Sequence, residues 1–161
     1  MSAADDLYRE VVLEHHRNPL GRQPLDRVDA EARGKNPNCG DEVLVQLQRE
    51  GETIVGVCAD ATGCAISTAS ASILAGLVQG AGCDRALHLV RLFRQLLSDR
   101  TESKLEANRA ELGDLEALIG VRKFPLRVKC AMLPWVALEQ ALESPGQAAP
   151  GVVSTEGSRS P

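Results

Sequence analysis

Four residues of this chain carry side chains that can hold one metal ion together: Cys39, Asp41, Cys64 and Cys130. Gly40 separates the first two in a segment of loop composition, and its backbone freedom lets both side chains point inward. Three thiolates and one carboxylate complete the four-coordinate sphere that zinc adopts in proteins. Because a carboxylate oxygen is a harder and more readily exchanged ligand than a thiolate, such a site can open. The residue types therefore predict an exchangeable zinc site.

Two of these cysteines lie in sequence contexts that stabilise a thiolate. Cys64 follows Gly63 at a predicted strand-to-helix junction, where backbone N–H groups and the helix dipole favour negative charge. Cys130 follows the cations Arg127 and Lys129, which lower the pKa of a nearby thiol. These two cations are interpreted either as groups that tune the site or as ordinary solvated charges. Spacing alone is weak evidence, because the chain has no Cys-x-x-Cys pair and free cysteines often fill a core.

The elements that must position these residues follow from the hydrophobic pattern. Residues 43–57 predict a β-hairpin, because apolar residues recur at every second position from Val43 to Leu47 and a turn follows. Residues 17–38 are rich in proline, glycine, asparagine and charge, which predicts a loop with one short strand near Val28. Strands that precede helices along a chain favour an α+β fold. We therefore expect a small antiparallel sheet of about three strands packed against several α-helices.

Helical periodicity is expected on both sides of this hairpin. An amphipathic helix precedes it and ends before Asn18-Pro19, and another begins near Cys64 and ends before Gly80. Pro134 predicts a kink or a fresh helix start late in the chain. The remaining expected elements are a helix over 84–98, a charged surface excursion over 99–112, a short helix over 115–118 and a segment that opens at Phe124-Pro125 and contains Cys130.

The composition of the chain indicates which part of it folds and argues against several classes of function. With 43% hydrophobic residues, residues 1–143 are expected to fold as one domain, whereas the turn-rich tail 144–161 predicts disorder. A net charge of −4, no basic stripe and 2% aromatic residues argue against nucleic acid or anionic membrane partners. No apolar stretch approaches the roughly 20 residues of a membrane span, and the acidic N-terminus lacks a signal-peptide layout. A cytoplasmic location is therefore expected, where five cysteines indicate thiols, metal ligands or catalysts more often than disulfides.

Four segments of the chain resemble the signature segments of the SufU/IscU-like family of iron–sulfur cluster assembly proteins. In chain order they are LYREVVLEHHRNPLG, NPNCGD, GCAISTASASIL and RVKCAMLPWVALEQAL. They extend from Leu7 to Leu142 and occur in the family's order, so the resemblance covers nearly the whole expected domain. Two features favour the SufU type over the IscU type: Lys129 stands where the IscU branch has a histidine, and residues 99–120 form an extra charged stretch.

The resemblance implies a function in sulfur relay. SufU-type proteins are implied to bind zinc through three cysteines and an aspartate, here Cys39, Asp41, Cys64 and Cys130. A SufS-like, pyridoxal-phosphate-dependent cysteine desulfurase makes a persulfide, and Cys39 is implied to accept its sulfane sulfur once a histidine of the partner replaces Cys39 on zinc. Its loop context agrees with that role, because the other two cysteines lie at helical segments that are harder to move. The chain would then be a zinc-dependent, sulfurtransferase-like persulfide carrier that uses Cys39 as its catalytic residue and supplies downstream assembly components.

Two other functions predict the same ligands. In one, the chain is a scaffold on which a [2Fe–2S] cluster is assembled and transferred. In the other, zinc is only structural.

The remaining cysteines and histidines have plainer interpretations. Cys58 is expected in the core, and Cys83 precedes a helix, where it is expected to be partly exposed but structural. His15 and His16 end the first helix and are interpreted as partners of its C-terminal dipole.

Overall fold

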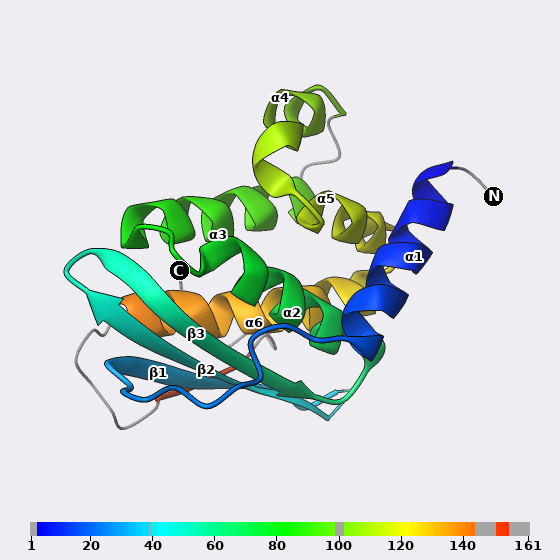
Figure 1. The fold of residues 1–161 in the computed structure, drawn as a ribbon. Coiled ribbons are helices and arrows are strands. Elements are labelled where there is room, and N and C mark those ends of the chain that lie inside the picture. The colour runs from blue at the N-terminus through cyan, green and yellow to red at the C-terminus, as the bar shows by residue number, and fades with distance from the viewer. Residues whose placement is uncertain (1–2, 39, 99–101, 144–150, 155–161) are drawn as a thin grey trace.

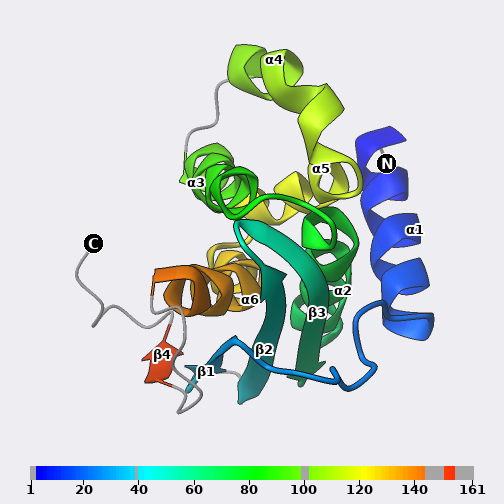
Figure 2. The same ribbon diagram turned by 60° about the vertical axis from the view of Figure 1, so that its left-hand side comes forward.

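The computed structural model describes residues 3–38, 40–98, 102–143 and 151–154. One sheet carries a layer of helices on one face, with α2 and α6 packed directly on its strands (Figure 1). Helix α1 lies against the far side of α2, so α2 is enclosed between α1 and the sheet (Figure 2). The elements in chain order are α1 (Ala3–Arg17), β1 (Ala30–Asn36), β2 (Asp41–Glu50), β3 (Thr53–Thr62), α2 (Ala65–Val78), α3 (Cys83–Ser98), α4 (Glu102–Leu112), α5 (Leu115–Leu118), the 3₁₀ helix η1 (Ile119–Lys123), α6 (Pro125–Glu143) and β4 (Gly151–Ser154).

The antiparallel sheet predicted from the sequence is confirmed. Strand β2 pairs with β1 and β3, and its alternate residues Val43, Val45 and Leu47 are buried against the helices. The hairpin formed by β2 and β3 extends beyond the predicted 43–57 at both ends. Strand β1 was largely missed, because AEARGKN contains no β-branched or aromatic residue that would mark a strand.

Strand β4 extends the sheet at its edge, where it pairs in parallel with β1 (Figure 2). It lies within 144–161, the segment for which the sequence predicts disorder. Residues 144–150 and 155–161 lie outside the described residues, and the domain boundary after residue 143 stays a prediction.

Helix α6 runs as one element through Pro134, so of the two predicted outcomes the fresh helix start is wrong. A proline has no N–H and cannot donate to the carbonyl four residues earlier. Ser70 of α2 forms polar contacts in this region: its hydroxyl donates to the Ala131 carbonyl at 2.6 Å and accepts the Trp135 indole N–H at 3.1 Å. These buried bonds connect α2 to α6 beside the proline.

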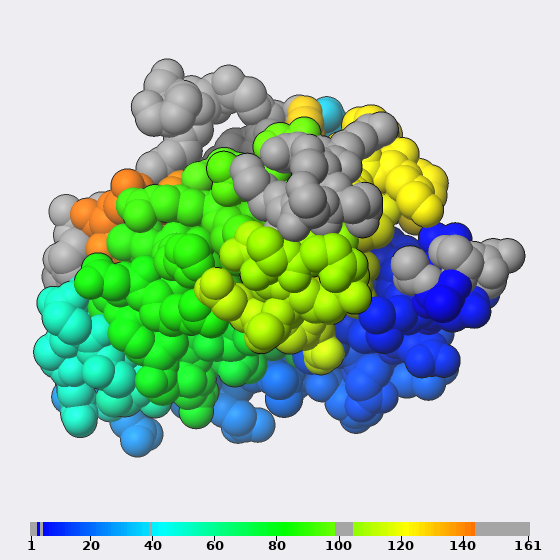
Figure 3. All heavy atoms as spheres, turned by 90° about the horizontal axis from the view of Figure 1, so that it is seen from above, coloured from blue at the N-terminus to red at the C-terminus, as the bar shows by residue number. Residues whose placement is uncertain are grey.

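The charged stretch predicted as a surface excursion contains a helix, α4. It projects from the helical layer on the side away from the sheet and lies between α3 and α1 when seen from above (Figures 1 and 3). Exposed ion pairs join it to its neighbours, from Glu111 to Arg85 at 2.5 Å and from Arg109 to Glu116 at 2.8 Å. Among the described residues, no helix combines the length and apolar character needed to cross a bilayer.

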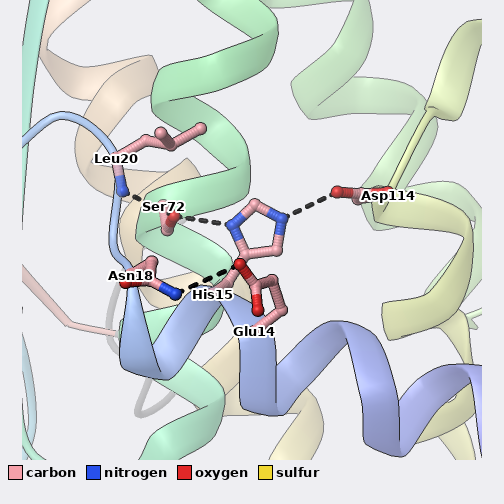
Figure 4. Close-up of polar contacts among 6 residues, drawn as sticks. All are labelled: Glu14, His15, Asn18, Leu20, Ser72 and Asp114. Carbon is pink, nitrogen blue, oxygen red and sulfur yellow. Dashed lines mark hydrogen bonds and ion pairs between the residues drawn. The ribbon is translucent and has the colours of Figure 1, made fainter.

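His15 is buried and connects α1 to α2 and to the residue before α5, so it is more than a dipole partner of α1. Its Nδ1 lies 2.6 Å from Ser72 Oγ in α2, and its Nε2 lies 2.7 Å from Asp114 Oδ2, just before α5 (Figure 4). The Leu20 backbone N–H donates to the same Ser72 oxygen at 2.8 Å. Ser72 can therefore donate its own proton to Nδ1 while Nε2–H donates to Asp114, which satisfies both ring nitrogens.

Replacing His15 with alanine is expected to lower the free energy of unfolding by about 2–3 kcal/mol, because it leaves buried polar groups unpaired. The matched control is His16→Ala, since His16 is exposed and its loss should cost less than about 0.5 kcal/mol. Urea unfolding of both variants measures the difference. Equal stabilities of the two variants would contradict a structural role for the His15 contacts.

Candidate metal centre

Three of the four residues singled out as metal ligands meet at one end of the sheet. Asp41 opens β2, Cys64 directly precedes α2 and Cys130 lies in α6. One ligand atom from each lies within 4.8 Å of the other two. The fourth predicted ligand, Cys39, lies outside the described residues; its neighbours Asn38 and Gly40 belong to the connection between β1 and β2.

Asp41 is fully buried and is held by the backbone that precedes α2. Its Oδ1 accepts the Cys64 N–H at 2.8 Å, and the Cys64 thiol contacts its Oδ2 at 3.2 Å. The carboxylate therefore lies directly beside one thiol and orients the backbone of the residue that carries it.

Cys64 is the N-cap residue of α2, as the predicted strand-to-helix junction requires. Its backbone is extended, and its Sγ accepts the Ser67 N–H at 3.5 Å. The sulfur therefore lies beside the free backbone N–H groups that begin the helix, and one of them donates to it.

Gly63 makes the approach of Asp41 to Cys64 possible. Its φ of +132° is a conformation that residues with a side chain rarely adopt, and a Cβ at this position would lie 2.0 Å from Asp41 Oδ1. The glycine is therefore required both by the backbone turn and by the space that the carboxylate occupies.

Asn36 is a residue near the site that the sequence reasoning missed. It is 2% exposed, its side-chain amide contacts Cys130 Sγ at 3.9 Å and its Oδ1 accepts the Asn38 N–H at 3.2 Å. The Gly40 N–H donates to the Asn36 carbonyl at 2.8 Å and closes the turn. The sequence signal that could have identified Asn36 is its position as the first residue of the NPNCGD segment.

A cavity of about 470 Å³ opens beside the two thiols, and we call it the cysteine pocket. Of the two candidate tuning cations, Arg127 lines it, whereas Lys129 is half-buried and is not among the described residues on its wall. The Arg127 guanidinium lies over the Phe124 ring, 4.6 Å from its centroid. The lining residues are Asn36, Asn38, Cys64, Ala65, Ile66, Leu126, Arg127 and Cys130.

Two further cysteines are buried away from this pocket. Cys58 lies on β3, and Cys83 begins α3, where it is 6% exposed rather than partly exposed as expected. Burial raises the pKa of both thiols, so both stay protonated and unreactive near neutral pH.

Comparison with known proteins identifies the family. Residues 7–131 match the NifU-like N-terminal domain. The chain is 37% identical to the zinc-dependent sulfurtransferase SufU of Bacillus subtilis over 86% of this chain and 90% of that protein. It is 35% identical to the iron–sulfur cluster assembly scaffold protein IscU of Streptococcus pyogenes, over 89% and 87%.

A solved structure agrees with this assignment. The putative iron–sulfur cluster assembly scaffold protein for the SUF system from Fervidobacterium islandicum superposes with a TM-score of 0.71 at 28% identity, over 85% of this chain and 97% of that one. The chain therefore belongs to the SufU/IscU family of iron–sulfur cluster assembly proteins, which share the NifU-like N-terminal domain.

Proposed function

We propose that this chain is a zinc-dependent persulfide acceptor, which takes sulfane sulfur from a pyridoxal-phosphate-dependent cysteine desulfurase for iron–sulfur cluster assembly. The observation that carries the proposal is the cluster of Asp41, Cys64 and Cys130 within 4.8 Å, in which Asp41 follows Cys39 by two residues in the sequence. The 37% identity to a protein named as a zinc-dependent sulfurtransferase supports the same assignment.

The residues at this site fit a zinc ion. Ligands bound to tetrahedral zinc at about 2.0–2.3 Å lie roughly 3.3–3.8 Å from one another, so the cluster, whose ligand atoms lie within 4.8 Å of one another, needs to close by about 1.5 Å at most. Zinc accepts both thiolate and carboxylate donors, whereas a hard cation such as magnesium does not favour the two thiols. Asp41, Cys64 and Cys130 would hold the metal together with Cys39. When bound, zinc would act as a Lewis acid that keeps its thiol ligands deprotonated at neutral pH.

Cys39 is the proposed acceptor because the other two thiols are fixed by helices. Cys64 caps α2, and Cys130 lies within α6, where its thiol donates to the Leu126 carbonyl at 3.6 Å. The Cys39 thiolate would attack the outer sulfur of the desulfurase persulfide. A new S–S bond then forms at Cys39, the S–S bond of the enzyme breaks, and the desulfurase cysteine leaves as a thiolate, with no net oxidation.

Metal content separates this proposal from the scaffold alternative, for which the 35% identity to an IscU protein is the supporting observation. Freshly purified protein should contain nearly one equivalent of zinc and form no stable cluster when reconstituted with iron and sulfide. Substantial iron with thiolate-to-iron absorption would reject the sulfur-transfer proposal. Zinc without any stimulation of the cognate desulfurase would leave only a structural metal.

The variant Cys39→Ala is expected to abolish stimulation of cysteine turnover by the desulfurase, because the attacking thiolate is lost. Its fold should be retained, since Cys39 lies in a sequence segment of loop composition. Cys83→Ala is the matched control, because Cys83 is buried elsewhere and should leave stimulation unchanged. Alanine production with an excess of cysteine measures the effect. Full stimulation by Cys39→Ala would refute the acceptor assignment.

A further inference from the structure

Asn36 is the last residue of β1, and the packing of this strand on α6 brings its side chain to one of the candidate ligands. Gly34, on the same face of β1, lies so close to α6 that a Cβ there would meet Leu133 Cδ1 at 3.0 Å. Cys130 lies one helical turn before Leu133, on the same face of α6. The close approach of the two elements therefore places the Asn36 side chain beside the Cys130 sulfur.

The hydrogen bonds of the Asn36 side chain determine which way its amide points. A backbone N–H can only donate, so the atom that faces the Asn38 N–H at 3.2 Å is the side-chain oxygen. The NH₂ group is then directed toward Cys130 Sγ, which lies 3.9 Å from Nδ2. Because an amide NH₂ group only donates, the sulfur is the acceptor in this contact.

Both partners of this contact are shielded from water. Asn36 is 2% exposed and Cys130 is 6% exposed. Among the residues that the structure describes, the Cys130 sulfur is the acceptor within reach of the Asn36 NH₂ group. A buried donor is costly to leave without an acceptor, so the amide is favoured in this orientation. A neutral thiol accepts weakly, whereas a thiolate is an anion and accepts more strongly.

The backbone of Asn36 contacts the residues that lead into β2. Asn36 pairs with Asp41 at the end of the β1–β2 ladder, and its carbonyl accepts the Gly40 N–H at 2.8 Å. Together with the bond from Asn38, these contacts hold the residues on both sides of Cys39 in the sequence. One residue thus connects the ligand on α6 to the segment that supplies the first two predicted ligands.

We propose that Asn36 is a positioning residue of the metal centre, whose NH₂ group donates to the Cys130 sulfur while its oxygens hold the backbone on either side of Cys39. The consequence of this inference rests on the proposed zinc-dependent function, because groups that bond to metal ligands orient them and tune the metal. Donation to a metal-bound thiolate withdraws electron density from its sulfur. Cys130 would then remain a ligand and be a weaker nucleophile than Cys39.

The first test uses the unmodified chain loaded with ¹¹³Cd, an NMR-active ion that thiolates bind in place of zinc. An N–H that donates to a metal-bound sulfur has a scalar coupling to the metal through the hydrogen bond. One proton of the Asn36 NH₂ group should therefore correlate with ¹¹³Cd. The internal control is the exposed Asn18 NH₂ group, which donates to Glu14 at 3.2 Å and should show no correlation. Bound cadmium without a correlation to Asn36 would overturn the proposal.

The second test removes the amide with Asn36→Ala. In the Co²⁺-loaded variant, the sulfur-to-cobalt charge-transfer absorption should move to lower energy, because the sulfur has lost a hydrogen-bond donor. Zinc affinity should fall about 10–100-fold, as is typical for loss of an outer partner of a ligand. Asn18→Ala is the control and should change neither property. A purely structural role would lower stability without moving the absorption, and an unshifted absorption would therefore overturn the proposal.

The third test separates this inference from the proposed function, because it uses the metal-free chain. Asn36→Ala should lower the urea midpoint of unfolding less in a Cys130→Ala background than in the parent, because the amide has already lost its acceptor there. Equal shifts in the two backgrounds would overturn the contact. If the parent chain binds no zinc or gives no stimulation of the desulfurase, the proposed function fails, and this comparison still decides whether the Asn36 amide donates to Cys130.

Discussion

A Gly63→Ala variant is expected to lose its metal binding and about 3 kcal/mol or more of stability. The backbone at Gly63 has a φ of +132°, and forcing a side chain into such a region costs about 1–3 kcal/mol by itself. The new Cβ would also lie 2.0 Å from Asp41 Oδ1 and 2.9 Å from Asp41 Cα, so the strand and the carboxylate must move away. That movement separates Asp41 from the Cys64 N–H. Urea unfolding and elemental analysis of the purified variant measure both losses.

The matched control for this substitution is Gly80→Ala. Gly80 also has a positive φ, +83°, but a Cβ there would meet no atom within 4 Å. It follows α2 at the end opposite to Cys64. The control should therefore show a strain cost of about 1–2 kcal/mol and full zinc content. If Gly63→Ala kept full zinc content as well, the close approach of Gly63 to Asp41 would not be required for zinc binding.

The second large effect is expected for Asp41→Asn. The amide keeps the size of the carboxylate, and its oxygen can still accept the Cys64 N–H, but it is a neutral and poor zinc ligand. Zinc affinity should fall by more than the roughly 10–100-fold that loss of an outer-shell partner costs. Competition with a chromophoric chelator measures the affinity, and the unfolding free energy of the zinc-free protein should change little.

Glu42→Gln provides the comparison for Asp41→Asn. Glu42 is the next residue of β2 and also a carboxylate, but its side chain is 57% exposed and pairs with Lys35 at 3.3 Å. Removing that charge should leave zinc affinity unchanged, because exposed ion pairs contribute little and the side chain lies on the other side of the strand. An equal affinity for zinc in both variants would remove Asp41 from the ligand set.

Several local features of this protein follow from short-range rules that the sequence obeys. The β2–β3 hairpin, the end of α1 before Asn18-Pro19 and the start of α2 at Cys64 were all predicted from periodicity, turn residues and helix termination. These rules depend on interactions within a few residues of the chain. They were enough to place Cys64 at the N-terminus of α2, beside the free backbone N–H groups that begin the helix.

Short-range rules failed where tertiary contacts outweigh local preference. Strand β1 has weak strand propensity and forms because β2 supplies its hydrogen-bond partners. Helix α6 continues through Pro134 in a tightly packed setting beside α2, where Ser70 bonds to Ala131 and Trp135. The partners of His15 likewise come from α2 and from the residue before α5, which no local pattern connects to α1.

The sequence by itself determined which residue types could form the site, since Cys39, Asp41, Cys64 and Cys130 each lie in a recognisable segment. It could not determine that three of them meet, because their segments are joined by long intervals whose path depends on how α2 and α6 pack on the sheet. Only the tertiary structure separated Arg127, on the wall of the cysteine pocket, from Lys129, two residues further along α6. The physical reason is that side chains two residues apart on an α-helix point in directions that differ by about 200°. Only the packing of α6 against its neighbours therefore decides which of the two faces the site.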